Sequence, residues 1–358
     1  MKVLIVFENK NVDNLFVPIL CRGLQAIGIE LECSVKKFWS EDTFYDIIHF
    51  QWPEEIIGWN NQNAHKIQQL KERIAFLKNR GTKFVYTRHN SRPHYYNAIT
   101  YTAYDIIESS CDTIVHMGQF SYNEFKQQYP QSHNVIIPHH IYENTYNENI
   151  SKEEAREKLG LSPDKFIITA FGKFRLKEEI SIVIKSFLKF KCKNKYLLAP
   201  RLLPFSPHAR NKNLYKRYIS KLLYHTSKFI CNLYSIQADN NEKIISNQAL
   251  PYYIIASDLL FIQRKRILNS GNLPLGFLFK KIVVGPDYGN IGEILKESGN
   301  PIFTPDNTGS IVQALTQGYS LAQTHKGKEN YLYAKQHFSL QYISELYRQT
   351  YTDLTQRP

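Results

Sequence analysis

The sequence lacks the short glycine motifs that define the common nucleotide-binding classes. The first apolar segment, Val3–Phe7, is followed by Glu8–Asn14, which contains no glycine, so a Gly-x-Gly-x-x-Gly motif is absent there. No Gly-x-x-x-x-Gly-Lys-Ser/Thr motif occurs anywhere in the chain. Because these motifs supply the phosphate-binding turns of their families, their absence excludes an N-terminal dinucleotide-binding domain and a P-loop ATPase.

Long apolar runs and paired cysteines are missing as well. No apolar run approaches the roughly 20 residues that a membrane-spanning helix needs, and the apolar stretch near Met1 is too short for the core of a signal peptide. The five cysteines form no Cys-x-x-Cys pair, which excludes a zinc ribbon and disfavours a disulfide framework. We therefore expect a cytoplasmic protein with reduced thiols.

Acidic residues are scarce relative to basic ones. The chain has 45 Lys and Arg against 32 Asp and Glu, a formal net charge of +13. Such an excess indicates an anionic partner, or else a solvated cationic surface. Basic residues concentrate in residues 201–228, where they alternate with Leu, Ile and Tyr and no acid occurs. This pattern predicts a basic amphipathic helix, which either lies on an anionic membrane surface or packs on its own domain.

Strand-like apolar segments alternate with helical segments along nearly the whole chain. This alternation is typical of parallel α/β domains, and 358 residues with 43% hydrophobic content suit two folded domains. The main expected helices of the first half are Leu15–Ile27 and Asn63–Asn79. The expected strands are Val3–Phe7, Asp46–Phe50, Lys83–Thr87, Asp112–His116, Asn134–Ile137, Phe166–Phe171, Tyr196–Ala199, Leu259–Ile262, Lys281–Val284 and Pro301–Phe303.

A polar segment, residues 138–150, separates the two series of strands. Ser151 then begins a helix with a capping box, because Glu154 stands three residues further on, and Gly160 is placed to end that helix. Two doubly wound Rossmann-like domains joined here would bind ligands in a cleft at the carboxyl ends of their strands. The expected parts are an N-terminal acceptor-binding domain, 1–150, a C-terminal nucleotide-sugar-binding domain, 151–328, and a C-terminal helix, 329–358, that packs across the domain junction.

Two turns in the second half have the composition of phosphate-binding sites. Ser270, Gly271 and Asn272 precede a predicted helix, and the backbone N–H groups of such a turn suit a phosphate, although the glycine could serve only to turn the chain. Arg175 and Lys177 follow the strand Phe166–Phe171 and would stabilise negative charge that grows on a phosphate. Alternatively, these are two exposed cations of a basic protein.

Four parts of the sequence, in this order and spacing, resemble the GT-B glycosyltransferases. Within them the likeness is to the large retaining family that includes lipopolysaccharide and phosphatidylinositol mannosyltransferases. It is stronger in the C-terminal half. The parts are VYTRHN with Pro93 and His94 together with NVIIPHH, then residues 151–177, then LPYYIIASDLLFIQ, and then ILNSGNLPLGFLFKKIVVGPDYGNIGEIL.

The resemblance implies roles for individual residues. Arg175 and Lys177 correspond to a phosphate clamp, and Glu293, in the turn after the strand Lys281–Val284, to a residue that holds hydroxyls of the donor sugar. An acid near a helix start is also favoured by the helix dipole alone. The implied residues are Arg175, Lys177 and His89 for catalysis, Gly172, Ser270, Gly271, Asn272 and Glu293 for donor binding, and Arg88, Asn90, His94 and His139 for acceptor binding.

The implied activity is retaining, metal-independent transfer of a sugar from a UDP- or GDP-sugar to a glycan or lipid-linked acceptor in cell-surface polysaccharide synthesis. No Asp-x-Asp motif occurs, so we expect no metal and no cofactor beyond the nucleotide-sugar substrate. We expect no nucleic-acid partner, and segment 201–228 would dock the protein on the inner face of the membrane. Two alternatives stay open: a nucleotide-sugar 2-epimerase of the same fold, and a non-catalytic basic protein that binds membranes or nucleic acid.

The sequence also departs from this family at the expected nucleotide site. The family commonly carries a Glu-x7-Glu motif, and its two positions correspond here to Ile267 and Leu275. The second of these carboxylates normally holds the ribose. The nucleotide must therefore be bound differently in this chain, and a non-catalytic member of the family stays open.

Overall fold

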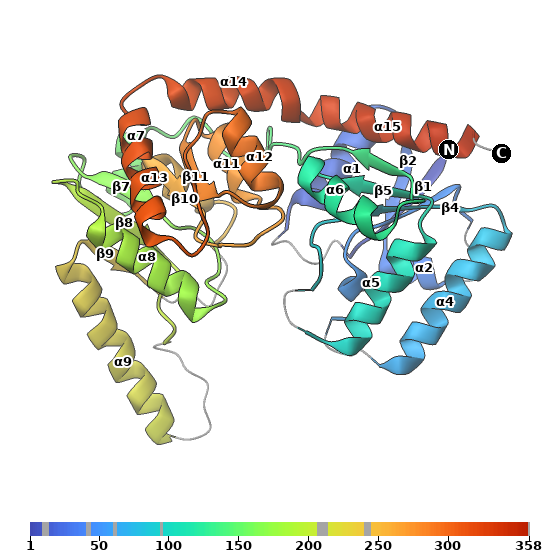
Figure 1. Ribbon diagram of the computed structural model, residues 1–358, viewed down its shortest axis with the longest axis horizontal. Coiled ribbons are helices and arrows are strands. Elements are labelled where there is room, and N and C mark those ends of the chain that lie inside the picture. The colour runs from blue at the N-terminus through green and yellow to red at the C-terminus, as the bar shows by residue number, and fades with distance from the viewer. Residues whose placement is uncertain are drawn as a thin grey trace. The chain divides into compact units, whose positions relative to one another are not determined.

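The computed structural model describes residues 1–8, 14–40, 44–59, 63–93, 96–205, 214–239 and 245–356. It contains two compact units, each built around a parallel sheet of six strands (Figure 1). One unit comprises Met1–His140 with His337–Pro358, and the other comprises Ile141–Gln336. We expected the division after residue 150, and the two compact units divide after His140. The predicted α/β class with two doubly wound sheets is confirmed.

The N-terminal sheet has the strand order β2-β1-β3-β4-β5-β6. β2 pairs with one edge of β1 and β3 with the other, so the direction of strand addition reverses there, as in doubly wound sheets. We did not predict β2, an edge strand whose sequence alternates acidic and apolar residues. The strands are β1 (Lys2–Val6), β2 (Glu30–Cys33), β3 (Ile47–Phe50), β4 (Lys83–Thr87), β5 (Thr113–His116) and β6 (Asn134–Ile136).

Helices cover both faces of this sheet. Because side chains alternate along a strand, Val3 and Ile5 of β1 pack in one core cluster with α1 and α15, and Leu4 and Val6 pack in a second with α4 and α5. The helices of the unit are α1 (Phe16–Ala26), α2 (Val35–Trp39), α3 (Pro53–Ile56), α4 (Ala64–Asn79), α5 (Ala98–Ser110), α6 (Gln119–Gln128) and α15 (Leu340–Gln356).

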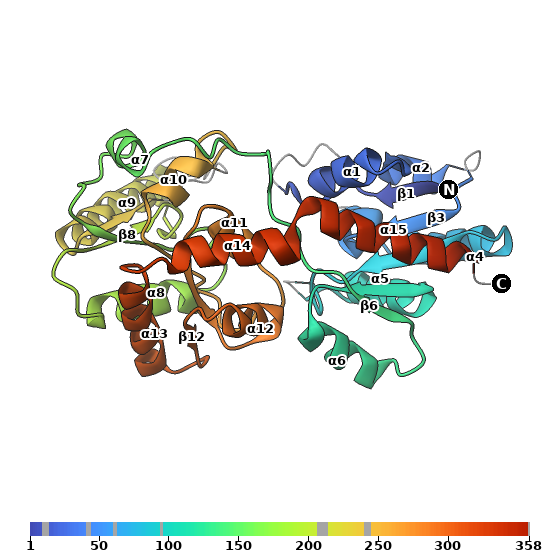
Figure 2. The ribbon, with the colours of Figure 1, turned by 90° about the horizontal axis from the view of Figure 1, so that it is seen from above.

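The C-terminal helix that we predicted over residues 329–358 is two helices. α14 ends at Phe338 and α15 begins at Leu340, with the Ser339 carbonyl accepting from the Ile343 backbone N–H. α15 lies across the N-terminal sheet (Figure 2) and buries Ile343 and Tyr347 in its core. α1 and α15 approach closely because Gly23 has no side chain: a Cβ there would lie 2.3 Å from the Ser344 hydroxyl.

The C-terminal sheet has the strand order β12-β11-β10-β7-β8-β9. Its strands are β7 (Phe166–Thr169), β8 (Lys195–Ala199), β9 (Ile236–Ala238), β10 (Leu259–Phe261), β11 (Ile282–Pro286) and β12 (Ile302–Phe303). We did not predict β9, a three-residue edge strand. The helices of this unit are α7 (Lys152–Lys158), α8 (Lys177–Lys189), α9 (Leu214–Leu233), α10 (Leu250–Ala256), α11 (Asn272–Leu278), α12 (Gly289–Glu297), α13 (Thr308–Leu321) and α14 (Lys326–Phe338).

α7 has the ends that the sequence predicts. The Ser151 hydroxyl accepts from the Glu154 backbone N–H at 3.0 Å, and Gly160, just beyond the helix, has a φ of +65°, which favours glycine. Arg156 of α7 donates to the Asp258 carboxylate at 2.8 Å, and the same carboxylate accepts from the Ile167 backbone N–H at 2.7 Å. Asp258 therefore ties α7 and β7 to the start of β10.

Candidate functional site

Three loops meet at the carboxyl edge of the C-terminal sheet. β7, β10 and β11 are neighbours and run parallel, so the loops that follow them leave the sheet on the same side. In open α/β sheets, ligands bind at this edge. The predicted donor-binding residues all lie on these loops or on the helices that follow them, α8, α11 and α12.

The loops after β7 and β10 contact each other through Gly172 and Asn272. The Asn272 side-chain N–H donates to the Phe171 carbonyl at 2.9 Å. Gly172 has a φ of +104°, and a Cβ on it would lie 3.7 Å from the same amide nitrogen. The Ser270 hydroxyl accepts from the Asn272 backbone N–H at 3.3 Å, and Gly271 is the residue before α11. The structure thus brings four of the predicted donor-binding residues together.

The loop after β11 is held against the loop after β10 by close backbone packing. Gly289 has a φ of +66°, and a Cβ there would lie 2.4 Å from the Ile267 carbonyl oxygen. Asn290 donates from its backbone to the Leu268 carbonyl at 3.0 Å and from its side chain to the Asn269 amide oxygen at 2.8 Å. Only glycine tolerates both the positive φ and the close approach of the Ile267 carbonyl at position 289. This glycine is therefore needed to join the loops.

We expected Glu293 to open its helix, but it does not. α12 begins at Gly289, because the glycine turn is already the first turn of the helix. Glu293 therefore lies one turn further along, half-buried on α12. The helix dipole acts mainly within the first turn and no longer explains an acid at this position.

Basic residues occur on the two loops that meet at Gly172 and Asn272. The Arg175 backbone N–H donates to the Glu179 carboxylate at 2.6 Å, which fixes the loop to the first turn of α8. Lys177 is the exposed first residue of α8. The buried Glu179 carboxylate also lies 3.4 Å from the Arg264 side chain, whose guanidinium donates to the Lys173 carbonyl at 3.2 Å.

Arg264 and Lys265 lie on the loop after β10, close to the predicted residues, and we did not predict them from the sequence. Lys265 pairs with Glu178 at 3.2 Å and with Asp306. The sequence did carry a signal for these residues, because the basic run Arg264-Lys265-Arg266 begins three residues after the end of the apolar strand β10. Because Arg264 and Lys265 are paired with the Glu179, Glu178 and Asp306 carboxylates, they order the loops at this edge of the sheet and add little net positive charge.

The two positions where the resembling family carries carboxylates are part of the core. Ile267 and Leu275 are buried, with 8% and 4% of their surface exposed. Leu275 lies in α11, between the buried Pro274 and Gly276. These apolar side chains pack inward and cannot replace the missing carboxylates as hydrogen-bond acceptors.

In the N-terminal unit, histidines follow the strands at the corresponding edge of the sheet. The His89 ring stacks on Trp52, with 4.0 Å between ring centroids, and meets the edge of Phe16. His139 meets the same phenyl ring edge-on, and His140 stacks on it. The structure therefore brings His89 and His139, predicted on separate loops, together around Phe16. Trp52 lies two residues after the end of β3, a position that the strand-end rule could have indicated.

A buried hydrogen-bond network supports His89. His89 Nε2 lies 2.8 Å from the Gln51 amide oxygen and donates to it, and the Gln51 side-chain N–H donates to His49 at 3.1 Å. His49 Nδ1 in turn lies 2.6 Å from the Tyr351 hydroxyl of α15. Burial lowers the pKa of His49 and of His139 to about 3, and it lowers the pKa of His89 well below its usual value. These imidazoles are therefore neutral at pH 7.

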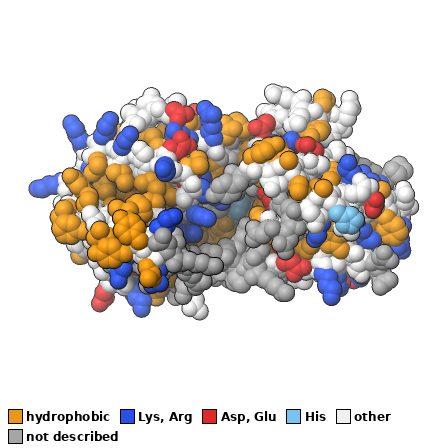
Figure 3. All heavy atoms as spheres, turned by 90° about the horizontal axis from the view of Figure 1, so that it is seen from below, with side chains coloured by type: hydrophobic (Ala, Val, Ile, Leu, Met, Phe, Trp, Pro, Cys, Tyr) orange, Lys and Arg blue, Asp and Glu red, His pale blue; other side chains and the backbone are white. Residues whose placement is uncertain are grey.

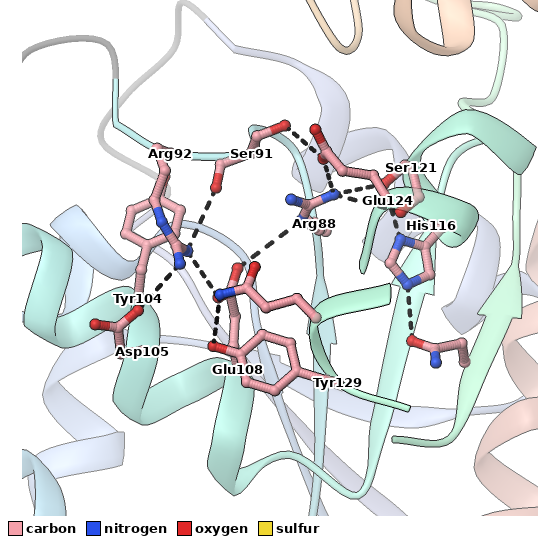
Figure 4. Close-up of polar contacts among 12 residues, drawn as sticks. Arg88, Ser91, Arg92, Tyr104, Asp105, Glu108, His116, Ser121, Glu124 and Tyr129 are labelled. Atoms are coloured by element: carbon pink, nitrogen blue, oxygen red, sulfur yellow. Dashed lines mark hydrogen bonds and ion pairs between the residues drawn. The ribbon is translucent and has the colours of Figure 1, made fainter. Parts of the chain in front are cut away.

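The predicted acceptor residue Arg88 is buried in a charge network (Figure 4). Its guanidinium lies 2.7 Å from the Glu124 carboxylate and 3.8 Å from Glu108, and Glu108 also binds Arg92 at 2.7 Å. These contacts stabilise the loop that carries His89. The role of Arg88 in acceptor binding stays a prediction.

The remaining predicted acceptor residues have different surroundings. Asn90 is half-buried and hydrogen-bonds Tyr104, whose hydroxyl donates to Glu54 at 3.1 Å. His139 donates from Nδ1 to the His140 carbonyl at 2.6 Å. His94 lies outside the described residues. Within the described part of the chain, no group of three or more His, Cys, Asp or Glu side chains is placed to hold a metal ion.

The two sheets and the order of their strands define the GT-B fold of the glycosyltransferases. The chain is similar to sucrose-phosphate synthase from Thermosynechococcus elongatus, with a TM-score of 0.70 and 12% identity over 99% of this chain and 100% of that one. It is also similar to HepE of Anabaena in complex with UDP-glucose, with a TM-score of 0.69 and 14% identity over 99% and 100% of the two chains. WaaG, a glycosyltransferase involved in lipopolysaccharide biosynthesis, has a TM-score of 0.59 and 11% identity over 100% of both chains.

No protein-family profile and no curated protein matches the sequence. At identities of 11 to 14%, the structural likeness establishes the fold. The activity of this chain must be argued from its own residues.

Proposed function

We propose that this protein is a retaining, metal-independent glycosyltransferase that takes a sugar from a UDP- or GDP-sugar. The observation that carries the proposal is the contact between Gly172 and Asn272, with Arg175 on the adjoining stretch of loop, at the carboxyl edge of the C-terminal sheet. The fold supports the same proposal, because HepE, which shares it, was solved with UDP-glucose.

The cations near this contact suit the chemistry of the donor. Breaking the bond between the sugar and the nucleotide leaves a diphosphate, so negative charge grows on the distal phosphate in the transition state. In the proposed mechanism, Arg175 binds that phosphate with two parallel N–H donors and Lys177 adds a point charge. Gly172 and Gly271 allow the diphosphate to approach the backbone closely. Glu293 accepts hydrogen bonds from sugar hydroxyls.

The nucleotide itself would be bound without the usual carboxylates. With Ile267 and Leu275 in the core, the charged contacts to the donor concentrate on its diphosphate. Arg264 and Lys265 are half-exposed on the loop after β10, and they would reach the diphosphate only by exchanging their ion pairs with Glu179, Glu178 and Asp306. Binding of the donor would therefore depend on cations and backbone amides more than is usual in the family that the sequence resembles.

The N-terminal unit would bind the acceptor, a glycan or a lipid-linked sugar of cell-surface polysaccharide synthesis. Sugars pack their apolar faces on aromatic rings, and the half-buried Trp52 supplies such a ring beside His89. A neutral imidazole that donates through one ring nitrogen can accept a hydrogen bond from a hydroxyl at the other. His89 and His139 would orient the attacking hydroxyl in this way.

Retention would follow from attack by the acceptor on the same face that the nucleotide leaves, with a phosphate oxygen taking the proton of the hydroxyl. This step requires cations to stabilise the leaving group. It needs no carboxylate side chain as a nucleophile. The absence of any Asp-x-Asp in the sequence supports a reaction without a metal. Donor charge would then be neutralised by side chains alone.

Turnover with a panel of UDP- and GDP-sugars tests the proposal. We expect release of the nucleoside diphosphate that depends on an added glycan or lipid-linked acceptor, that EDTA leaves unchanged, and that gives a product with the donor's anomeric configuration by NMR. Epimerised donor without acceptor would instead establish the epimerase. Loss of turnover with EDTA would contradict the metal-independent mechanism.

A further inference from the structure

α9 (Leu214–Leu233) is held to the C-terminal unit by one narrow side. Its buried residues are Tyr224 and Cys231, which join the core cluster of the sheet. The Tyr224 hydroxyl and the Lys228 ammonium group both donate to Asp239, at 2.7 and 3.0 Å. One end of the helix lies against the edge strand β9, and the other extends beyond the sheet (Figure 1).

The opposite side of α9 is apolar and exposed. A surface helix normally buries its apolar stripe against the core and turns its polar side outward, but this helix does the reverse. Hydrophobic side chains of the unit gather over α9 with Lys and Arg around them (Figure 3). Such a patch marks an interaction site. The main residues of this outer face, each 54 to 71% exposed, are Tyr215, Tyr218, Leu222, Phe229 and Leu233.

The chain around α9 carries only positive charge. No Asp or Glu occurs between Glu179 and Asp239, whereas twelve Lys and Arg do. On α9 itself, Lys216, Arg217 and Lys221 are exposed. At 100° per residue Lys216 and Lys221 flank the apolar face, whereas Arg217 lies on the side of Tyr224. The occupant of this face must therefore be apolar at its centre and negatively charged around it.

An anionic membrane surface meets both conditions, and other occupants do not. A second copy of the chain would bring the same acid-free segment against itself, with repulsion between like charges. A partner helix would need a narrow seam, but here Ile219 and Ile230 widen the apolar face, and the heptad positions between Tyr218 and Leu233 include His225 and Asn232. Aromatic residues flanked by Lys and Arg are typical of helices that lie in a membrane interface.

We infer that α9 docks the protein on an anionic membrane by lying in the interface with Tyr218, Leu222 and Phe229 among the lipid headgroups. The helix lies in the membrane plane, because within the described ranges no helix has the length and hydropathy for a membrane span. The inference concerns a surface separate from the loops after β7, β10 and β11, so it does not depend on the proposed reaction.

Co-sedimentation of the full chain with vesicles tests this inference. We expect binding to phosphatidylcholine vesicles that contain about one-third phosphatidylglycerol, much weaker binding to phosphatidylcholine alone, and release as salt approaches about 0.5 M. The double variant Leu222→Ser/Phe229→Ser should lose at least about tenfold in partitioning, since both side chains leave the interface. The variant Lys216→Gln/Lys221→Gln should lose binding mainly at low salt.

Matched variants distinguish loss of the α9 surface from general effects of removing exposed apolar side chains. Leu332→Ser/Tyr342→Ser removes apolar side chains that are 56% and 47% exposed on α14 and α15, and it should bind vesicles like the wild type. The α9 variants should keep the wild-type melting temperature, because the residues are exposed. Equal partitioning of Leu222→Ser/Phe229→Ser and the wild type would overturn the inference, as would a homodimer in solution that this variant abolishes.

Discussion

Arg175→Ala should lower kcat/KM for sugar transfer by about 10²- to 10³-fold, the range measured when one donor to a developing charge is removed. The loop should keep its position, because its link to Glu179 is made by the Arg175 backbone N–H and survives the substitution. Arg175→Lys should recover part of the loss, because it restores the charge without the paired N–H donors. Initial rates over a range of donor concentrations measure both variants.

A matched control is available on the adjoining helix. Lys185 is an exposed cation of α8, and Lys185→Ala removes the same charge from the same unit away from the three loops. We expect this variant to keep wild-type turnover. Full turnover of Arg175→Ala, or an equal loss in both variants, would contradict the assignment of Arg175 to the donor phosphate.

Lowering the pH from 7 to 5 should destabilise the N-terminal unit by several kcal/mol. Burial lowers the pKa of His49 and His139 to about 3 and that of His116 to about 4, against about 6.5 in the unfolded chain. Between these values the unfolded state binds more protons, so stability falls as the pH drops below about 6.5. At pH 5 each such histidine costs about 2 kcal/mol. Glu55, whose burial raises its pKa to about 7, acts in the opposite direction and offsets about one of them.

Tryptophan fluorescence reports this loss selectively. Trp39, Trp52 and Trp59, all the tryptophans of the chain, lie in the N-terminal unit. Urea unfolding followed by fluorescence at pH 7.5, 6 and 5 should show a falling midpoint. His49→Gln should flatten this dependence by about 1.4 kcal/mol per pH unit, whereas exchange of the exposed His65 to Gln should leave it unchanged. A midpoint that is constant from pH 7.5 to 5 would contradict neutral buried histidines.

The fold could be predicted from the sequence because its signals are local. Buried parallel strands are continuous apolar runs, and the Ser151 capping box and Gly160 fix the ends of α7 within a few residues of chain. The two missed strands, β2 and β9, are short edge strands. In β2 acidic residues alternate with apolar ones, and β9 has only three residues, so neither forms an apolar run. The break at Ser339 was missed because the apolar spacing continues from α14 into α15.

The candidate site could be predicted only in part. The turn at Ser270–Asn272 and the cations after β7 were identified from composition, but their contact through Gly172 depends on strand order, which the sequence does not state. The same applies to Arg264, which approaches Glu179 across 85 residues of chain. For α9 the sequence predicted an amphipathic helix and left open whether it packs on its own domain or lies on a membrane, since periodicity does not show which side the helix turns to the core.

The most direct test of the central claim, that the C-terminal unit binds a nucleotide-sugar diphosphate, is a thermal-shift panel of UDP, GDP, ADP and their sugars. A ligand that binds only the folded state stabilises it by RT ln(1 + [L]/Kd). We predict that UDP or GDP raises the melting temperature in proportion to the logarithm of its concentration, that Lys185→Ala responds alike, and that Arg175→Ala loses most of the shift. Melting temperatures that no nucleotide changes, at concentrations up to the millimolar range, would contradict the claim.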